Sequence, residues 1–186
     1  MSNFRGFMQK LSIVSRLWEA ADYDTALAEV ESLLKTWPGN ARLHILWASL
    51  VQLQEDPKHD LDEAKQALRQ AVELDKESPA AAIELGYFLN NVGDDPHAAS
   101  KAYADGVATA RRLLIEGLIG QAKVFRQLEK REEFLHCLSE VLQVARFETV
   151  PKRTKAEAPG ADILFKGPYA EQIQELLGEV VTDRPA

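Results

Sequence analysis

The sequence has very little cysteine, since Cys137 is the single thiol among 186 residues. One cysteine can form neither an internal disulfide nor a thiolate cluster around a metal ion, and this usage is typical of a reducing compartment. A chain of this length can bury about two thirds of its unfolded surface, so it can fold without covalent staples. We therefore expect one domain, or one domain with a tail, held together by packing.

Positive charge and long apolar runs are also scarce. The chain has 22 Lys and Arg against 29 Asp and Glu, which gives a net charge of −7. This charge argues against non-specific binding to the phosphates of nucleic acids. Arg5, Gln9 and Lys10 interrupt the N-terminus before an apolar run of signal-peptide length develops. No stretch approaches the ~20 apolar residues that span a bilayer. We expect a cytoplasmic protein without a membrane span.

The chain is instead rich in helix formers from about residue 11 to residue 144, with apolar residues at three- and four-residue steps. Asp, Asn and Ser occur where N-caps are needed, and Asp60 with Glu63 forms a predicted capping box. Stop signals follow, such as Trp37-Pro38-Gly39 and Val92-Gly93. The pattern predicts helices of about 12–16 residues joined by short turns, which is typical of antiparallel helix hairpins.

These helices repeat in register. Positions that are equivalent in successive repeats form what we call a column. In the second helix of each hairpin, one column holds Ala26, Ala64, Ala99 and Phe134, and another holds Val30, Leu68, Tyr103 and Leu138. Both columns repeat at intervals of 38, 35 and 35 residues. The first helices repeat at intervals of 34, 38 and 36 residues, in Leu11, Ile45, Ile83, Ile119 and in Val14, Ala48, Gly86, Ala122. Small residues in these columns let helices approach closely. Stacking of successive hairpins buries an apolar face that a single hairpin would expose to water.

The chain resembles the tetratricopeptide repeat (TPR) family at this point. Asp22-Tyr23-Asp24-Thr25-Ala26-Leu27 and the closing Pro38-Gly39-Asn40 carry the resemblance in the first repeat, and Leu85-Gly86 with Gly93 carries it in the third. Departures include a four-residue insertion within 56–61 and Gln121-Ala122 in place of Leu-Gly in the fourth repeat. The resemblance implies an all-α fold, a right-handed α-solenoid of helix-turn-helix repeats over residues 1–146, with repeats at about 5–40, 41–78, 79–113 and 114–146.

The remainder of the chain has a different character. Residues 147–167 are polar, carry proline and lack a period, so we expect a linker. Residues 168–186 contain an acidic amphipathic helix over about 168–181 whose apolar stripe must be buried. Two docking sites stay open for this helix: the last repeat, as a cap, or the groove of the solenoid, whose basic residues complement its glutamates.

No catalytic, cofactor or metal site emerges. The four histidines lie in different repeats and none has a metal-ligand spacing: His44, His59, His97 and His136. His136 adjoins Cys137, but neighbours on a helix point about 100° apart, so we favour an inert, partly buried thiol. The basic run Lys152-Arg153-Thr154-Lys155 could touch RNA, a lipid surface or an acidic protein, but such a run usually solvates a linker.

The surface with functional content is the groove. The resemblance implies that columns of the first helices line it, and their register gives a candidate partner-binding surface: Leu11, Ser15, Trp18, Arg42, Ile45, Ser49, Gln52, Ile83, Tyr87, Asn90, Ile119, Lys123 and Arg126. The aliphatic column Leu11, Ile45, Ile83, Ile119 has two interpretations, the floor of a groove or packing against neighbouring helices. The family's clamp for a chaperone's C-terminal carboxylate is absent, since its positions hold Leu11, Ser15, Leu46 and Glu84.

The sequence therefore favours a non-enzymatic adaptor or assembly chaperone that binds a peptide or amphipathic helix of another protein. A bacterial secretion-type chaperone is an alternative within binding proteins. A nucleic-acid-binding module or an unrecognised enzyme is an alternative of a different class. We expect no cofactor, no metal and no nucleic acid partner, and we leave a homodimer open.

Overall fold

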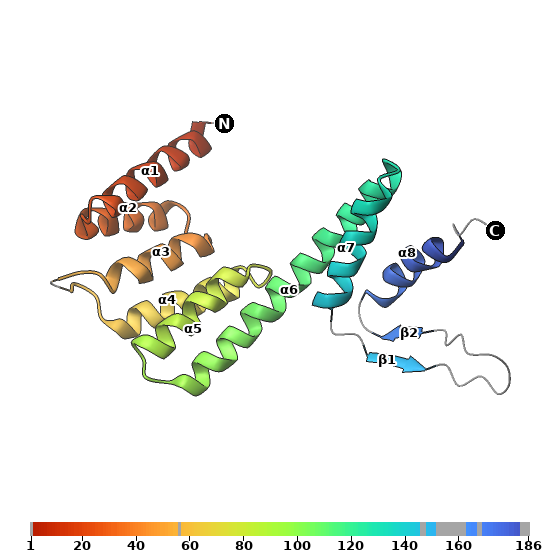
Figure 1. The fold of residues 1–186 in the computed structure, drawn as a ribbon. Coiled ribbons are helices and arrows are strands. Elements are labelled where there is room, and N and C mark those ends of the chain that lie inside the picture. The colour runs from red at the N-terminus through yellow and green to blue at the C-terminus, as the bar shows by residue number, and fades with distance from the viewer. Residues whose placement is uncertain (1, 56, 146–147, 152–162, 167–168, 183–186) are drawn as a thin grey trace. The chain divides into compact units, whose positions relative to one another are not determined.

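The computed structural model describes residues 2–55, 57–145, 148–151, 163–166 and 169–182 (Figure 1). The elements in chain order are α1 (Ser2–Glu19), α2 (Tyr23–Thr36), α3 (Ala41–Val51), α4 (Leu61–Leu74), α5 (Pro79–Asn91), α6 (Pro96–Gln127), α7 (Arg131–Val144), β1 (Glu148–Pro151), β2 (Ile163–Lys166) and α8 (Ala170–Thr182). The chain divides into two compact units, 1–110 and 111–186, and α6 contributes residues to both.

The first unit consists of helix hairpins in sequence. In Figure 1, α1 lies beside α2, α3 beside α4, and α5 beside the first part of α6. Each second helix also contacts the first helix of the next hairpin, α2 with α3 and α4 with α5, and α3 contacts α5. This succession of contacts is the packing that repeated hairpins require in order to bury their apolar faces.

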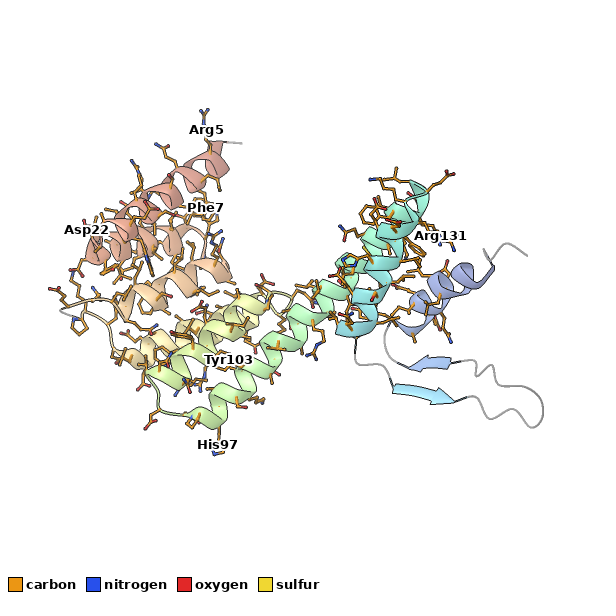
Figure 2. All side chains as sticks on the ribbon, viewed as in Figure 1. Arg5, Phe7, Asp22, His97, Tyr103 and Arg131 are labelled. Atoms are coloured by element: carbon orange, nitrogen blue, oxygen red, sulfur yellow. The ribbon has the colours of Figure 1, made fainter. Side chains whose placement is uncertain are left out.

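The helix ends follow the predicted capping chemistry. The side-chain oxygens of Asp22, Asn40 and Ser78 accept hydrogen bonds from backbone N–H groups in the first turns of α2, α3 and α5. Asp60 and Glu63 form the full capping box at the start of α4, with bonds of 2.7 and 3.0 Å. Each such cap stabilises its helix by about 1 kcal/mol, because donors that would otherwise lose water are satisfied. The turn at Asp22 is labelled in Figure 2.

The predicted small-residue columns are buried, as close helix packing demands. Ala26, Ala48 and Ala64 have no exposed surface. The tightest approach joins α5 to α6: a Cβ on Gly86 would lie 2.9 Å from the Tyr103 ring, and a Cβ on Gly106 would lie 2.8 Å from Cγ1 of Ile83. Glycine is therefore required at both positions. Figure 2 shows Tyr103 on α6, directed toward α5.

Helix α6 is the main departure from the predicted architecture. Its 32 residues run without interruption through residues 113 and 114, where the third repeat was expected to end and the fourth to begin. The local sequence explains this, because residues 108–114 read Ala-Thr-Ala-Arg-Arg-Leu-Leu, with neither proline nor glycine to stop a helix. The register of the columns persists although no turn separates the two helices.

The second unit has its own core. Residues of α6, α7 and α8 form one buried cluster, with these members: Ile115, Leu118, Ile119, Ala122, Phe134, Cys137, Leu138, Val141, Ala145, Ile173 and Leu176. The apolar stripe of the C-terminal helix therefore packs on α6 and α7, which is the arrangement expected of a cap. Ile173 and Leu176 are almost fully buried there.

The segment expected to be a linker contains two short strands. β1 and β2 pair in antiparallel fashion, with Thr149 opposite Phe165 and Val150 opposite Leu164. Their β-branched and aromatic residues favour extended backbone, but four-residue strands are too short to show a period. The strands and the first unit's boundary at residue 110 both differ from the expected division into 1–146, 147–167 and 168–186. The basic run 152–155 lies outside the described residues.

Candidate partner-binding surface

A cavity of about 220 Å³ lies between α1 and α3 in the first unit. Four of its lining residues belong to the predicted groove, namely Leu11, Ser15, Trp18 and Arg42, and the others are Val14, Glu19 and Leu46. Leu11, Ser15 and Trp18 share a face of α1 because they are spaced four and three residues apart. Arg42 and Leu46 are spaced four apart on α3 in the same way. The cavity is smaller than the roughly 300–1,000 Å³ of typical small-molecule sites, and its size suits one large side chain.

The walls of this cavity are apolar and its charged groups are exposed. Val14 is buried and Trp18 is half-buried, with its ring 6.0 Å from that of Tyr23 in an edge-on arrangement. Arg42 is exposed and forms no ion pair with any described residue. Glu19 carries the opposite charge on the same cavity. A bound ligand can thus bury an apolar group in the cavity while a polar or acidic group of the same ligand contacts the Arg42 guanidinium.

The other polar groove residues of α1 and α3 use their donors within their own helices. The hydroxyls of Ser15 and Ser49 donate to the carbonyls of Leu11 and Ile45, at 3.2 and 3.0 Å. The Gln52 amide donates to the Ala48 carbonyl at 2.9 Å. Such internal bonds leave these side chains with acceptor capacity for a ligand. Arg42 is accordingly the group on this face best placed to select a ligand by charge.

The four residues of the aliphatic column differ in how deeply they are buried. Leu11 and Ile45 are half-buried and pack against the first unit's core, and Ile83 retains about a third of its surface although it packs on Gly106. Ile119 is 3% exposed in the core of the second unit, so its assignment to a groove was wrong. Ile119 shares this buried cluster with residues of α7 and α8.

The remaining candidates lie on exposed helix surface. Tyr87 is 61% exposed, and Asn90 donates to the side chain of Asn91. Lys123 and Arg126 are exposed on α6 within the second unit. The cavity thus brings together the candidates of α1 and the first candidate of α3, whereas those of α5 and α6 do not line it.

Sequence reasoning did not assign Val14, Glu19 and Leu46 to this surface. Val14 was placed in a core column, and Leu46 was noted only as a position where the chaperone clamp is missing. The helical spacing could have identified two of them, since Val14 lies three residues after Leu11 and Leu46 lies four residues after Arg42, on the same helix faces.

A second, shallower cavity of about 570 Å³ lies between α6 and α7, and sequence reasoning missed it. It is lined by Gln121, Phe125, Glu132, Glu133, His136, Cys137 and Glu140. The Cys137 thiol donates to Oε1 of Gln121 at 3.5 Å. Burial, and then the Glu140 carboxylate, raise the pKa of Cys137, so the thiol stays protonated at neutral pH. A protonated thiol is a poor nucleophile, in keeping with the inert thiol expected here.

Two of the four histidines, His44 and His59, make structural contacts. His44 is buried, with Nε2 2.7 Å from the carbonyl oxygen of Pro38. His59 lies in the insertion before α4, where it contacts Glu31 at 2.8 Å and packs edge-on to Trp47. Among the described residues, no three His, Cys, Asp or Glu side chains come together in a way that could hold a metal ion.

A polar contact anchors α8. The Tyr169 hydroxyl donates to Oε1 of Glu116 on α6 at 2.8 Å, and Arg112 donates to the same oxygen at 3.1 Å. The Tyr169 bond, and then Arg112, lower the pKa of Glu116, so this carboxylate is ionised at neutral pH. Burial and the Glu116 carboxylate raise the pKa of Tyr169. The start of α8 is thus tied to α6 by a charge-assisted hydrogen bond.

None of the described helices is long and apolar enough to cross a membrane. No family model matches the chain, and the number of repeats therefore stays a prediction. An uncharacterised 18.1 kDa protein from the carS 3′ region of Myxococcus xanthus is 29% identical over 99 residues, which cover 48% of this chain and 58% of that protein. The chain thus spans less than two thirds of this relative.

The similar solved structures are helical-repeat proteins. MamA from Desulfovibrio magneticus RS-1, in a form that begins at residue 41, is 24% identical with a TM-score of 0.50, and the match covers 57% of each chain. A double mutant of MamA RS-1 gives 23% identity, the same TM-score and the same coverage. Likeness at this level shows the fold alone. The predicted all-α fold class is thereby confirmed: the chain has the fold of a TPR-like helical-repeat protein.

Proposed function

We propose that the chain is a non-enzymatic adaptor or assembly chaperone that binds a segment of another protein on α1 and α3. The observation that supports this most directly is the cavity of about 220 Å³ lined by Leu11, Ser15, Trp18 and Arg42. These residues come from two successive first helices, so one extended or helical segment can contact both.

The ligand that fits this surface has one large apolar side chain and an acidic group close to it. The apolar side chain enters the cavity against Trp18 and Leu46. The acidic group pairs with Arg42, which is exposed and has no ion pair among the described residues. An anchor in a desolvated pocket beside a charged rim is the arrangement from which peptide-binding surfaces gain most of their affinity.

The test is selection of peptides on the full chain from a random displayed library, followed by measurement of affinity by fluorescence anisotropy. We expect the selected peptides to share a large apolar residue near Asp or Glu, and we expect Arg42→Glu to weaken them by about tenfold or more. Arg69→Glu is the matched control, because Arg69 is exposed on α4, a second helix. Peptides that bind Arg42→Glu as tightly as the wild type would refute the proposed surface.

A second variant tests the apolar part of the site. Leu46→Ala enlarges the cavity without adding charge, and it should reduce the affinity of peptides that carry the apolar anchor. Peptides in which the anchor is replaced by alanine should be insensitive to the same change. Ile45 and Ile83 are less suitable, since neither lines the cavity. Leu46 also packs on the core of the first unit, so circular dichroism should show that the Leu46→Ala chain is folded.

A further inference from the structure

Helix α6 presents a second apolar face within the second unit. Its residues Ile115, Leu118, Ile119 and Ala122 are buried in the core. The opposite face is also apolar, and its members follow one another at steps of four, three, four and four residues: Leu113, Gly117, Gly120 and Val124 on α6, and Leu128 in the turn directly after it. We call these five residues the outer seam of α6. Val124 and Leu128 are 50% and 59% exposed.

The outer seam is shaped to receive another helix. A Cβ built on Gly117 or Gly120 would find no atom within 4 Å, so the helix backbone is open to close approach there. Leu113 and Val124 stand on either side of the glycines as exposed apolar side chains. A helix that is apolar on both faces is usually buried on both. Steps of three and four residues are those by which packed helices keep one face in contact over several turns.

We propose that the outer seam binds the same seam of a second copy of this chain, with the two α6 helices antiparallel. This orientation brings Gly117 of one copy opposite Gly120 of the other, so that the backbones meet where side chains are absent. On both sides of that point, Leu113 of one copy packs against Val124 of the other. Large residues thus fill the space beside the glycines, and the surface complements itself about a two-fold axis.

The charges beside the seam agree with this orientation. Glu116 and Lys123 lie on the same flank of the seam, seven residues apart. Antiparallel pairing places Glu116 of one copy beside Lys123 of the other, and the two-fold axis makes this contact twice. Both hydrogen bonds that Glu116 receives end on Oε1, and Lys123 has no ion pair among the described residues. The cavity at α7 is unsuited to a second copy, because Glu132, Glu133 and Glu140 would face like charges.

The test is sedimentation of the full chain over a range of concentrations. One pair of short helices buries less area than the 1,200–2,000 Å² of standard interfaces, so we expect a reversible dimer in the range of about 1–100 µM. Dimerisation would raise the mass to about twice the 20.8 kDa of one chain. A single species of 20.8 kDa throughout this range would overturn the proposal.

Two variants identify the surface. Val124→Lys should raise the dimer dissociation constant by about tenfold or more, whereas Val107→Lys should not. Val107 is the matched control for Val124, because both valines lie on α6 and they are 49% and 50% exposed. Gly117→Leu should also break the dimer, and it favours helix within the monomer, so circular dichroism separates loss of pairing from loss of folding. Val124→Lys that dimerises like the wild type would also overturn the proposal.

Cross-linking tests the orientation. A mixture of Leu113→Cys and Val124→Cys chains should form mixed disulfide dimers on mild oxidation, because antiparallel seams bring these positions together. Each variant alone should cross-link poorly, and the wild type serves as the background, since Cys137 is 2% exposed. Efficient self-cross-linking of Leu113→Cys alone would contradict the antiparallel orientation. Peptide binding at the α1 and α3 cavity is a separate measurement, so either proposal can fail alone.

Discussion

At the scale of single residues, glycine has two opposite roles in this chain. Gly86 and Gly106 lie where another helix already touches the backbone, so any side chain there meets a neighbour. Gly117, Gly120 and Gly178 lie in helices where a Cβ would have open space. Glycine costs helix stability of about 1 kcal/mol relative to alanine. The cost is offset by packing in the first group, and in the outer seam it keeps the backbone accessible.

Gly106→Ala should therefore destabilise the first unit. The new Cβ would lie 2.8 Å from Cγ1 of Ile83 and 3.3 Å from the Pro79 carbonyl oxygen, and the backbone atoms cannot move away cheaply. We expect a loss of about 1–3 kcal/mol in the free energy of unfolding, despite the better helix propensity of alanine. Urea denaturation followed by circular dichroism measures it.

The control for this prediction is Gly6→Ala in α1, where the same methyl group would meet no neighbouring element within 4 Å. It should leave stability unchanged or raise it by up to about 1 kcal/mol. Equal destabilisation by both variants would show that the contact with Ile83 is not the cause.

At the scale of elements, the helices could be predicted where their signals are local. The N-caps Asp22, Asn40 and Ser78 each act within three residues, and all three form the expected hydrogen bonds. The strands could not be predicted in this way. Thr149 and Val150 in β1 favour extended backbone, but their pairing with β2 joins residues separated by a long stretch of chain.

Helix α8 illustrates the same limit for the candidate site. Its apolar stripe showed that it must be buried, but the residues that bury it belong to α6 and α7. Ile119 belongs to the same cluster and is 3% exposed. In the first unit, three residues of the predicted surface, Ser15, Trp18 and Arg42, line one cavity between α1 and α3. Periodicity thus predicts which residues of neighbouring repeats share a face, whereas a contact with a distant element such as α8 leaves no local signal in the sequence.

Ile173→Ala should weaken the second unit strongly. Ile173 has no exposed surface and packs in the cluster formed by α6, α7 and α8. Removing its side chain leaves a cavity, and we expect a loss of about 2–5 kcal/mol in the free energy of unfolding of this unit. Hydrogen exchange of amides in α7 and α8 provides the measurement, since it reports the stability of these helices separately.

The neighbouring Gln172 supplies the comparison, because it is exposed on the same helix. Gln172→Ala should change amide protection little, within about 0.5 kcal/mol. If Ile173→Ala preserved the protection of α7 and α8, the packing of α8 on α6 and α7 would be wrong.

At the scale of the whole molecule, α6 is the element whose residues belong to both compact units. Repeat periodicity alone places a turn near residue 113, because the columns keep nearly the same interval there as in earlier repeats. The absence of proline and glycine from residues 108–114 is the competing local signal, and in the structure it prevails. Register therefore predicts which residues are equivalent, but only turn chemistry predicts where a helix ends.

A proline in α6 tests whether residues 96–127 form one continuous helix or two helices with a turn near residue 113. Ala110→Pro removes the N–H of residue 110 and brings the ring against the carbonyl of Gly106, so in a continuous helix it should cost about 3 kcal/mol or more. Arg131→Pro is the matched control, because Arg131 is the first residue of α7 after the N-cap Lys130, where no internal N–H bond is lost. Circular dichroism and urea denaturation should show reduced helicity and stability for Ala110→Pro, with Arg131→Pro close to the wild type. Equal tolerance of both prolines would mean that α6 is two helices, and the outer seam, whose first member is Leu113, would then begin at a helix terminus.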